Sequence, residues 1–432
     1  MWVKMKPVQC GIDVVLANPP RWRHCRIALV TNHAACTANF IPSRQALLEA
    51  GFRLVKLFSP EHGLDTTGAD GHEMQGGTDP LTGLPVISLY GTKLAPGKED
   101  LTDIDLVLFD IPDVGCRFYT YLWTMTCVME SCLRYAKPLV IADRPNPLSG
   151  RLDLAEGPLL DETHCSSFIG RWRMPVRHSC TLGELASYFW VERLGGSRSE
   201  WLDGAGAFLR NEALLSVIPC LHWRRSMCCP EWNVSFVPTS PAITSFESAL
   251  LFPMLGLLEA ANISEGRGTA TPFRVAGAPW IDEVRTAAVF NAILSNSAMP
   301  SGVLARPAVF TPSEGKFAGE KCRGVMFHIS DSAIFRPVMT GWLLIRIIRS
   351  LHPGLFAWSP YCTFVNRTGG RHLDLLLGIQ NAESLFGEFD ANACAETAAL
   401  SVPVLEAIGD EIRSYTGLGD WADRITPYLI YP

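Results

Sequence analysis

Residues 53–64 read R-L-V-K-L-F-S-P-E-H-G-L, an apolar run that stops abruptly at a proline. Pro60 has no amide hydrogen to donate to a sheet, so the strand predicted by this run ends before it. Gly63 permits a tight turn, which leaves Glu61 and His62 pointing out of the fold. A carboxylate and an imidazole held at a strand end suit acid/base chemistry. A helix-start glutamate beside a surface histidine explains the same residues equally well.

Short apolar runs alternate with amphipathic stretches through the first half of the chain. The runs rich in Val, Ile and Leu predict strands over residues 26–32, 53–58, 84–90, 104–111 and 138–142. The amphipathic stretches predict helices over residues 43–50 and 119–136. Strands of this composition that alternate with helices are typical of a mostly parallel sheet with helices on both faces. The sequence therefore predicts an α/β fold.

The chain changes character over residues 217–241, where Trp, Arg and Cys cluster before the proline-rich stretch P-T-S-P at 238–241. Proline spacing of this kind marks a boundary or a crossover between domains. We expect a first domain over residues 1–238 and a smaller α+β domain over residues 239–432. In the second domain the patterns predict helices over residues 246–259 and 340–351 and a strand over residues 324–330.

Polar side chains follow each predicted strand of the first domain. In open α/β sheets, ligands bind outside the carboxyl ends of the strands, so these residues should share one edge. Polar loops would explain them too, but ordinary loops favour Gly, Ser and Asn over bulky His, Tyr and Arg. The convergence therefore favours a functional site at this edge, formed by Asn32, His33, Glu61, His62, Tyr90, Asp110, Asp113, Asp143 and Arg144.

The stretch D-I-P-D-V-G-C-R-F-Y-T-Y at residues 110–121 is dense in functional residue types. Carboxylates bind sugar hydroxyls or metals, and Arg117 can bind a carboxylate through two hydrogen bonds. Tyr119 and Tyr121 can form an apolar wall against a sugar ring. Alternatively, Arg117 pairs with Asp113 to hold the turn, and both tyrosines lie in the core.

Residues 143–147 read D-R-P-N-P, in which two prolines fix the backbone around Asn146. Arg144 and Asn146 suit recognition of a polar ligand. A rigid turn with Asp143 capping a helix is the alternative.

Two further segments hold candidate residues. Thr181, followed three residues later by a glutamate, predicts a helix start with a capping box, and His178 just before it is a candidate ligand-binding residue. Residues 262–269, N-I-S-E-G-R-G-T, match neither the P-loop pattern nor the dinucleotide-binding pattern. We expect them to form a turn that presents Glu265 and Arg267 across a cleft between the domains.

Composition excludes several classes of partner. The formal net charge is −6 and no basic stripe is present, so we expect no nucleic-acid partner. No run approaches the ~18 uninterrupted apolar residues of a membrane helix, so we expect no membrane insertion. The first residues lack the apolar region of a signal peptide, and the 14 cysteines are scattered as in a reducing compartment. We therefore expect a cytoplasmic protein.

The sequence gives no diagnostic metal motif. None of the cysteines forms a paired C-x-x-C arrangement, and there is no H-E-x-x-H. His62 and His72 flank Asp65 and Asp70, but this spacing is not specific for a metal. We expect neither a metal nor a cofactor.

Six ordered motifs carry a resemblance over nearly the whole chain. They are P-E-H-G (60–63), D-P-x-T-G-L-P-V-x-S-L-Y-G (79–91), F-D-I-x-D-V-G-x-R-F-Y-T-Y (109–121), D-R-P-N-P-L-x-G (143–150), E-G-P (156–158) and N-I-S-E-G-R-G-T (262–269). Together they resemble the exo-β-N-acetylmuramidase (NamZ-type) family, glycoside hydrolase family 171, formerly a domain of unknown function.

The resemblance implies a Rossmann-like first domain, a smaller C-terminal domain and an active site in the cleft between them. It also implies release of N-acetylmuramic acid from the non-reducing end of peptidoglycan fragments, so the expected partners are muramic-acid saccharides. Glu61 matches the proposed catalytic glutamate of the family. Three features depart from the family: Pro112 replaces the usual Gln, Leu64 replaces an aromatic residue, and the signal peptide of many members is not seen.

We expect Glu61 to be the general acid, with its pKa raised by burial and His62 tuning it or binding the sugar. The second catalytic group is Asp110, Asp113 or the acetamido group of the substrate. Arg117, Arg144 or Arg267 supplies the cation for the lactyl carboxylate. The other residues expected to bind substrate are Asn32, Tyr90, Tyr119, Asn146, His178 and Glu265.

Two other classes of function fit the same residues. A sugar-binding protein would keep the cleft without hydrolysis and would respond to a ligand without releasing product. A metal-dependent hydrolase would use His62, His72 and Asp110 and would lose activity with a chelator.

Overall fold

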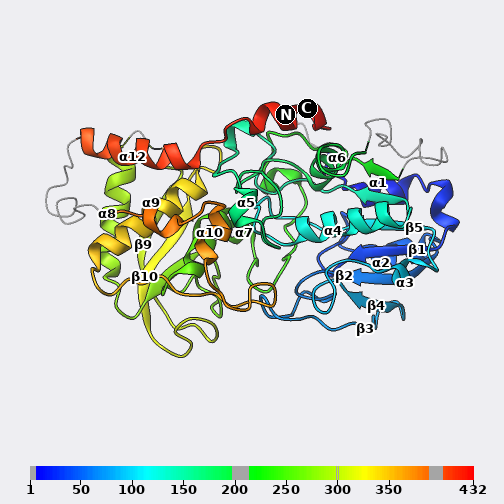
Figure 1. Ribbon diagram of the computed structural model, residues 1–432, viewed down its shortest axis with the longest axis horizontal. Coiled ribbons are helices and arrows are strands. Elements are labelled where there is room, and N and C mark those ends of the chain that lie inside the picture. Colours follow the sequence, from blue (N-terminus) through cyan, green and yellow to red (C-terminus); the bar gives the residue numbers. More distant parts are fainter. Residues whose placement is uncertain (1–5, 197–213, 298, 300, 389–401) are drawn as a thin grey trace.

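A seven-stranded sheet organises the first lobe of the computed structural model (Figure 1). Its strands run in the order β3-β4-β2-β1-β5-β6-β7, and every neighbouring pair is parallel except β3 with β4. The predicted mostly parallel sheet is therefore confirmed, and the five expected strands begin and end within two residues of the observed ones. The strands are β1 (Ile27–Thr31), β2 (Leu54–Ser59), β3 (Gly77–Thr78), β4 (Pro85–Ser88), β5 (Leu106–Asp110), β6 (Leu139–Ala142) and β7 (Leu215–Ile218).

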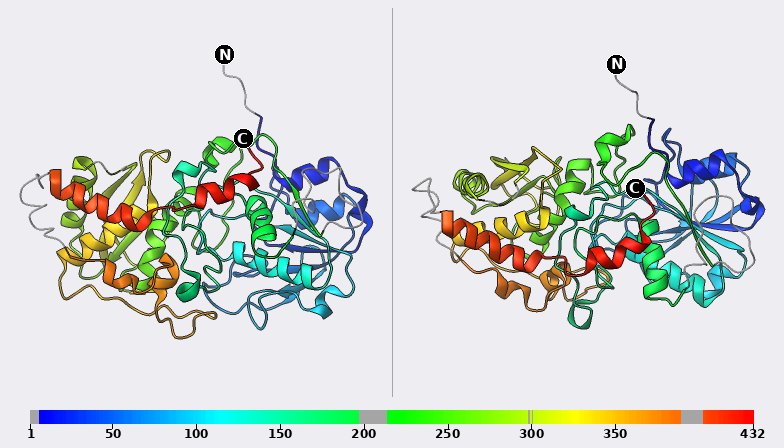
Figure 2. Two further views of the ribbon diagram at one scale, coloured as in Figure 1. Left: turned by 45° about the horizontal axis from the view of Figure 1, so that its top comes forward. Right: turned by 90° about the horizontal axis from the view of Figure 1, so that it is seen from above.

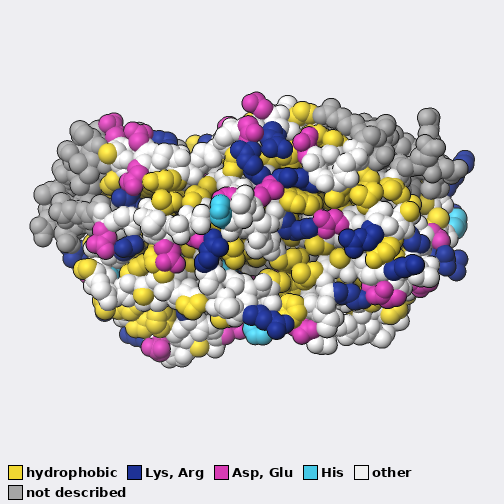
Figure 3. All heavy atoms as spheres, in the orientation of Figure 1, with side chains coloured by type: hydrophobic (Ala, Val, Ile, Leu, Met, Phe, Trp, Pro, Cys, Tyr) yellow, Lys and Arg dark blue, Asp and Glu magenta, His cyan; other side chains and the backbone are white. Residues whose placement is uncertain are grey.

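The structure describes residues 6–196, 214–297, 299, 301–388 and 402–432. None of the helices in these ranges is long and apolar enough to cross a membrane. Lys and Arg side chains are interspersed with Asp and Glu over the face drawn in Figure 3.

Alternate residues of each central strand point to opposite faces of the sheet, because side chains in a strand have a period of two. Ala28 and Val30 of β1 join the large apolar core, whereas Ile27 and Leu29 join a smaller one. The large core also holds residues of α4 (Tyr121–Arg134) and α6 (Leu182–Glu192), and the smaller core holds residues of α1 (Gly11–Ala17) and α2 (Ser43–Glu49). Helices thus cover both faces, as predicted.

Local signals set the element ends that matter for the site. Strand β2 ends at Ser59, immediately before Pro60, as expected from the missing amide hydrogen. The capping box predicted at Thr181 is confirmed, since its hydroxyl accepts from the amide of Glu184 and the Glu184 carboxylate accepts from the amide of Thr181. The Asp143 carboxylate also accepts from the amide of Gly183 at 2.8 Å, so it binds the start of α6.

The second lobe contains a three-stranded antiparallel sheet in the order β8-β10-β9, which confirms the smaller α+β part of the predicted fold. The helix expected over residues 246–259 is α only to Leu255 and continues as a 3₁₀-helix over Gly256–Ala260. Pro253 lies within the α-helical part and has no amide hydrogen to donate, which favours the change to the tighter 3₁₀-helix that follows. The elements of the second half of the chain are α7 (Phe246–Leu255), β8 (Val275–Ala278), α8 (Glu283–Asn296), β9 (Val303–Phe310), β10 (Cys322–Ile329), α9 (Pro337–Leu351), α10 (His372–Leu377), α12 (Val402–Thr416) and α13 (Trp421–Ile425).

Two contacts, among others, tie the second half of the chain to the first lobe. The buried Glu156 carboxylate accepts hydrogen bonds from the amides of Val338 and Met339 in the first turn of α9, where a negative charge is favoured. The last residues of the chain return to the first lobe (Figure 2), where the hydroxyl of Tyr431 donates to the Asp143 carboxylate at 2.5 Å. The segment that follows the second sheet therefore completes the packing of the first.

A buried ion pair joins β5 to the turn after β6. The Arg144 guanidinium donates to both carboxylate oxygens of Asp110, at 2.6 and 3.0 Å, and to the carbonyl of Cys36 at 2.9 Å. Asp110 has no exposed surface. The pair fixes the ends of neighbouring strands at the edge where the sequence predicted a ligand site.

We expect Asp110→Ala to lower the free energy of unfolding by about 3–5 kcal/mol, because it leaves a buried guanidinium without its partner. Urea denaturation measures the loss. Asp105→Ala is the matched control, since the Arg26–Asp105 pair is exposed and its removal should change stability little. Equal stability of both variants would show that the Asp110–Arg144 pair does not hold the strand ends.

Candidate active site

A cavity of about 60 Å³ lies between the two lobes and takes wall residues from both. The first lobe contributes Glu61 and His62 from the turn after β2, Tyr90 after β4, and Tyr119 and Thr120 before α4. The second lobe contributes ionisable and aromatic side chains, among them Glu259, Arg267, Phe273, Tyr361 and His372.

Glu61 is held by two hydrogen bonds inside this cavity. Its carboxylate accepts from the amide of Gly71 at 2.9 Å and from the hydroxyl of Thr120 at 2.6 Å. The residue is 5% exposed. Burial raises the pKa of Glu61 above its usual range, although His62 and the two hydrogen bonds oppose the shift. The arrangement therefore fixes the carboxyl in place, and its burial favours the neutral form.

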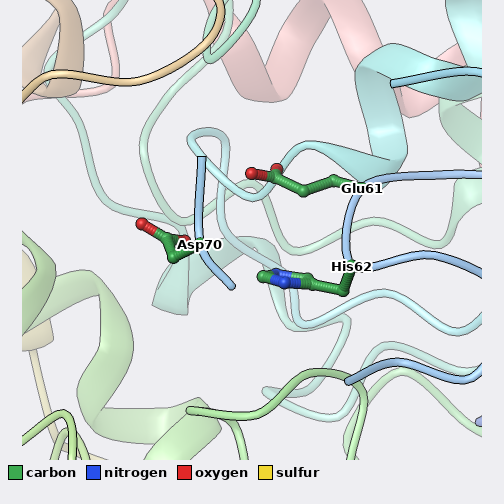
Figure 4. A group of neighbouring side chains, drawn as sticks. All are labelled: Glu61, His62 and Asp70. Carbon is green, nitrogen blue, oxygen red and sulfur yellow. The ribbon is translucent and has the colours of Figure 1, made fainter. Parts of the chain in front are cut away.

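His62 adopts a left-handed backbone conformation, with φ of 68°, which few residues other than glycine adopt readily. Its Nδ1 lies 2.8 Å from the carbonyl oxygen of Gly68. A carbonyl can only accept, so Nδ1 carries a proton and donates to it, and Nε2 is the ring nitrogen left for a ligand. The strained turn thus aims the imidazole beside Glu61 (Figure 4).

Asp70 completes the group of side chains in Figure 4, and the sequence indicated it only as a neighbour of two histidines. Its carboxylate accepts from the hydroxyl of Tyr361 at 2.5 Å and lies 3.2 Å from Nη2 of Arg267. Burial alone would raise the pKa of Asp70, but Arg267, His62 and Tyr361 outweigh it and lower the pKa below its usual range. Asp70 is therefore held as a carboxylate.

Glu61, His62 and Asp70 each offer one potential metal-ligating atom, and these atoms lie within 4.8 Å of one another. Among the described residues no other group of three or more His, Cys, Asp or Glu side chains meets this criterion. The set differs from the expected His62, His72 and Asp110, because Asp110 is bound to Arg144 outside the cavity.

Arg267 is the centre of a buried ionic cluster in the second lobe. It donates to Glu259 and to Glu265, each at 2.8 Å, in addition to its contact with Asp70. His372 Nε2 lies 3.0 Å from the second carboxylate oxygen of Glu259. Nε of Arg267 and Nδ1 of His372 are buried without a hydrogen-bond partner among the described atoms. The cluster thus keeps two unsatisfied nitrogens on side chains that line the cavity.

The structure brings together five of the site residues expected from the sequence. Those that line the cavity are Glu61, His62, Tyr90, Tyr119 and Arg267. The remaining expected residues do not line it: Asn32, Asp110, Asp113, Arg117, Arg144, Asn146, His178 and Glu265.

Most of these remaining residues hold the fold. Arg117 is fully buried and donates to the carbonyls of Pro158, Met174 and Leu376, so it pairs with no carboxylate. The Asn146 side chain bonds to the backbone of Leu148 and Cys180, as a rigid turn requires.

Asp113 and Arg144 line a second cavity, of about 70 Å³, which lies along the same sheet edge. Asp113 also lies 3.3 Å from Nε2 of His178, which is fully buried. Of the three arginines proposed for a substrate carboxylate, only Arg267 reaches the cavity that contains Glu61.

Sequence reasoning missed four ionisable wall residues: Asp70, Glu259, Tyr361 and His372. Glu259 lies at the end of a predicted helix, and Tyr361 and His372 lie in a segment without a recognisable motif. Asp70 was the one with a signal, since it stands nine residues after Glu61 in a glycine-rich loop.

Comparison with known proteins gives consistent matches over the chain. The family models described as Exo-beta-N-acetylmuramidase NamZ, N-terminal, and Exo-beta-N-acetylmuramidase NamZ, C-terminal, match residues 27–247 and 250–396. The curated Peptidoglycan beta-N-acetylmuramidase NamZ of Bacillus subtilis (strain 168) is 37% identical over 368 residues, which are 85% of this chain and 83% of the relative.

Two solved structures of DUF1343 family proteins from Bacteroides fragilis NCTC 9343 have the same fold. Each is 26% identical and covers 99% of both chains, with TM-scores of 0.78 and 0.67. With both family models matched in order, this chain belongs to the exo-β-N-acetylmuramidase NamZ family.

Proposed function

We propose that this protein is an exo-acting glycosidase that releases N-acetylmuramic acid from the non-reducing end of peptidoglycan fragments. The observation that carries the proposal is the buried Glu61 carboxyl, whose pKa is raised inside the cavity between the lobes. A glycosidase needs a neutral carboxyl there to protonate the departing oxygen. Membership of the NamZ family supports N-acetylmuramic acid as the sugar.

The wall of the cavity suits a single sugar ring at the end of a chain. Phe118 and Phe252 line the cavity with apolar surface for the C–H face of a pyranose, and the ionisable groups line it for its hydroxyls. On one side the amide of Phe364 donates to the carbonyl of Gly71 at 2.6 Å, which joins the lobes next to the cavity. A site bounded in this way favours a chain end over the middle of a chain.

Arg267 is the residue that we propose for the lactyl carboxylate of muramic acid. Its Nε is buried and unpartnered, so a ligand oxygen would supply the missing acceptor. We assign His62 to a hydrogen bond with the substrate through its available Nε2, and Tyr90 and Tyr119 to the wall around the ring.

We further propose a domain boundary near residues 238 and 239, and action on cell-wall turnover fragments in the cytoplasm. The family models that meet between residues 247 and 250 support such a boundary. The 13 cysteines in the described residues are all unpaired, which supports a reducing compartment.

We expect Glu61→Gln to lower kcat on a chromogenic β-N-acetylmuramide about 10²–10⁴-fold, because the amide cannot donate an acidic proton. The variant should fold, since a glutamine can still accept from Gly71 and can donate to the hydroxyl of Thr120. A raised pKa in the folded state costs stability at pH values above the unfolded pKa, so the variant should melt at or above the wild-type temperature at pH 7. At a pH low enough to protonate Glu61 in both states, this difference should vanish.

Glu73→Gln is the matched control, because Glu73 is exposed in the same loop and outside the cavity. It should keep the wild-type rate. Full activity of Glu61→Gln would contradict the assignment. Ligand-induced stabilisation of the wild type without product would favour a binding protein, and loss of activity in EDTA that added metal restores would favour a metal-dependent hydrolase.

The alkaline limb of kcat/KM should report the deprotonation of Glu61 and should lie above the 4.5 of an ordinary glutamate. The Thr120 hydrogen bond stabilises the charged form, so Thr120→Val should raise the pKa of Glu61 further and move this limb to higher pH. Thr124→Val is the control, since the buried Thr124 hydroxyl has no partner among the described residues. If the alkaline limb of kcat/KM does not move in Thr120→Val, this limb reports the deprotonation of a group other than Glu61.

A further inference from the structure

We infer that Asp70 is the second catalytic carboxylate, which attacks the anomeric carbon, so that hydrolysis retains the anomeric configuration. The inference rests on the proposed glycosidase function. It names a residue outside all six motifs that carry the family resemblance.

Asp70 is placed against Glu61 by the same short loop. The amide of Gly71 donates to the Glu61 carboxylate, and the side chain of the preceding residue, Asp70, lines the same cavity and lies in one group with Glu61 and His62 (Figure 4). A shift of this loop would therefore move both carboxyl groups together. Such coupling preserves the separation on which a two-carboxylate mechanism depends.

The separation between the two side chains matches the shorter class of glycosidase geometry. Ligating oxygens of Glu61 and Asp70 lie within 4.8 Å of each other. Retaining enzymes place their carboxyl groups about 5–5.5 Å apart, whereas inverting enzymes need about 6.5–9.5 Å to admit a water. The nearest oxygens of this pair match the retaining spacing better than the inverting one, so direct attack by the carboxylate is favoured.

The surroundings also give the two carboxyl groups opposite charge states. The guanidinium of Arg267 and the hydroxyl of Tyr361 stabilise the ionised form of Asp70, while burial favours the neutral form of Glu61. When two neighbouring carboxyl groups have pKa values that are shifted in opposite directions, the one with the raised pKa is usually the acid and the other the nucleophile.

The other carboxylates are worse placed. Asp110 and Asp113 do not line the cavity. Glu259 does, but it is not in the group formed by Glu61, His62 and Asp70, whose potential ligand atoms lie within 4.8 Å of one another. Asp70 is therefore the remaining carboxylate of the cavity, within the described residues, that lies beside Glu61.

The reaction balances with these two groups and one water. In the first step an Asp70 oxygen bonds to the anomeric carbon, the bond from that carbon to the departing oxygen breaks, and the Glu61 proton moves to that oxygen. In the second step water bonds to the anomeric carbon, its proton moves to the Glu61 carboxylate, and the ester bond to Asp70 breaks. Arg267 and Tyr361 then stabilise the released carboxylate.

Proton NMR during hydrolysis of 4-nitrophenyl β-N-acetylmuramide by the wild-type protein gives the first test. We expect the β-anomer of N-acetylmuramic acid to appear first and the α-anomer to follow by mutarotation. Initial formation of the α-anomer would overturn the inference but leave the glycosidase function intact. Absence of any hydrolysis would instead refute the proposed function.

Asp70→Ala with sodium azide gives the second test. We expect kcat to fall about 10⁴-fold and azide to restore turnover with α-N-acetylmuramyl azide as product, since azide takes the place of the missing carboxylate. If Asp70 only holds Arg267 and Tyr361 between the lobes, KM should rise and azide should restore nothing, which would overturn the inference.

Two variants keep this test interpretable. Asp70→Asn retains the shape of the side chain, so loss of kcat with a wild-type melting temperature would separate chemistry from folding. Asp65→Ala removes an exposed aspartate of the same loop and should leave kcat and the product unchanged.

Discussion

The two hydrogen bonds that Glu61 accepts are the constraint on which the site depends. They bring the end of β2, the loop at Gly71 and the start of α4 to one carboxyl group. Each segment is fixed elsewhere for its own reason: Pro60 ends the strand, the Asp70 side chain ties the loop to the second lobe, and Tyr121 packs the helix into the large core. The acid is therefore positioned by the fold as a whole rather than by its own turn.

The second lobe contributes charge as well as shape. Arg267 joins carboxylates from both lobes, and Tyr361 stacks on His372 with ring centroids 4.8 Å apart. A buried cluster of this kind costs desolvation, which its mutual contacts must offset. Within one small volume, burial favours the neutral form of Glu61, whereas Arg267 and Tyr361 hold Asp70 ionised. The chemistry of the cavity is thus a property of the interface between the lobes.

The sequence predicts the fold well because its signals are local. Pro60, the runs of β-branched residues and the Thr181 capping box act within a few residues, and each ends or starts an element where expected. The site is predicted only in part, because the tertiary structure decides which charged side chains pair with one another. Asp110 and Arg144 have the residue types of a ligand site, yet they satisfy each other across neighbouring strands. Asp70 has its role through Arg267 and Tyr361, which stand about 200 and 300 positions later in the chain.

The return of the C-terminal segment to the first lobe has a consequence for biosynthesis. Asp143 lies at the end of a strand in the first lobe, but its carboxylate receives the hydroxyl of Tyr431, and Trp421 donates to the carbonyl of His178. These residues emerge from a ribosome long after the strands of the first sheet, the last of which ends at Ile218. The first lobe can collapse early, but these buried polar groups are satisfied only once residues 421–431 have been synthesised. Until then, the first lobe of a nascent chain is incompletely packed. A chaperone can still bind the chain in this state.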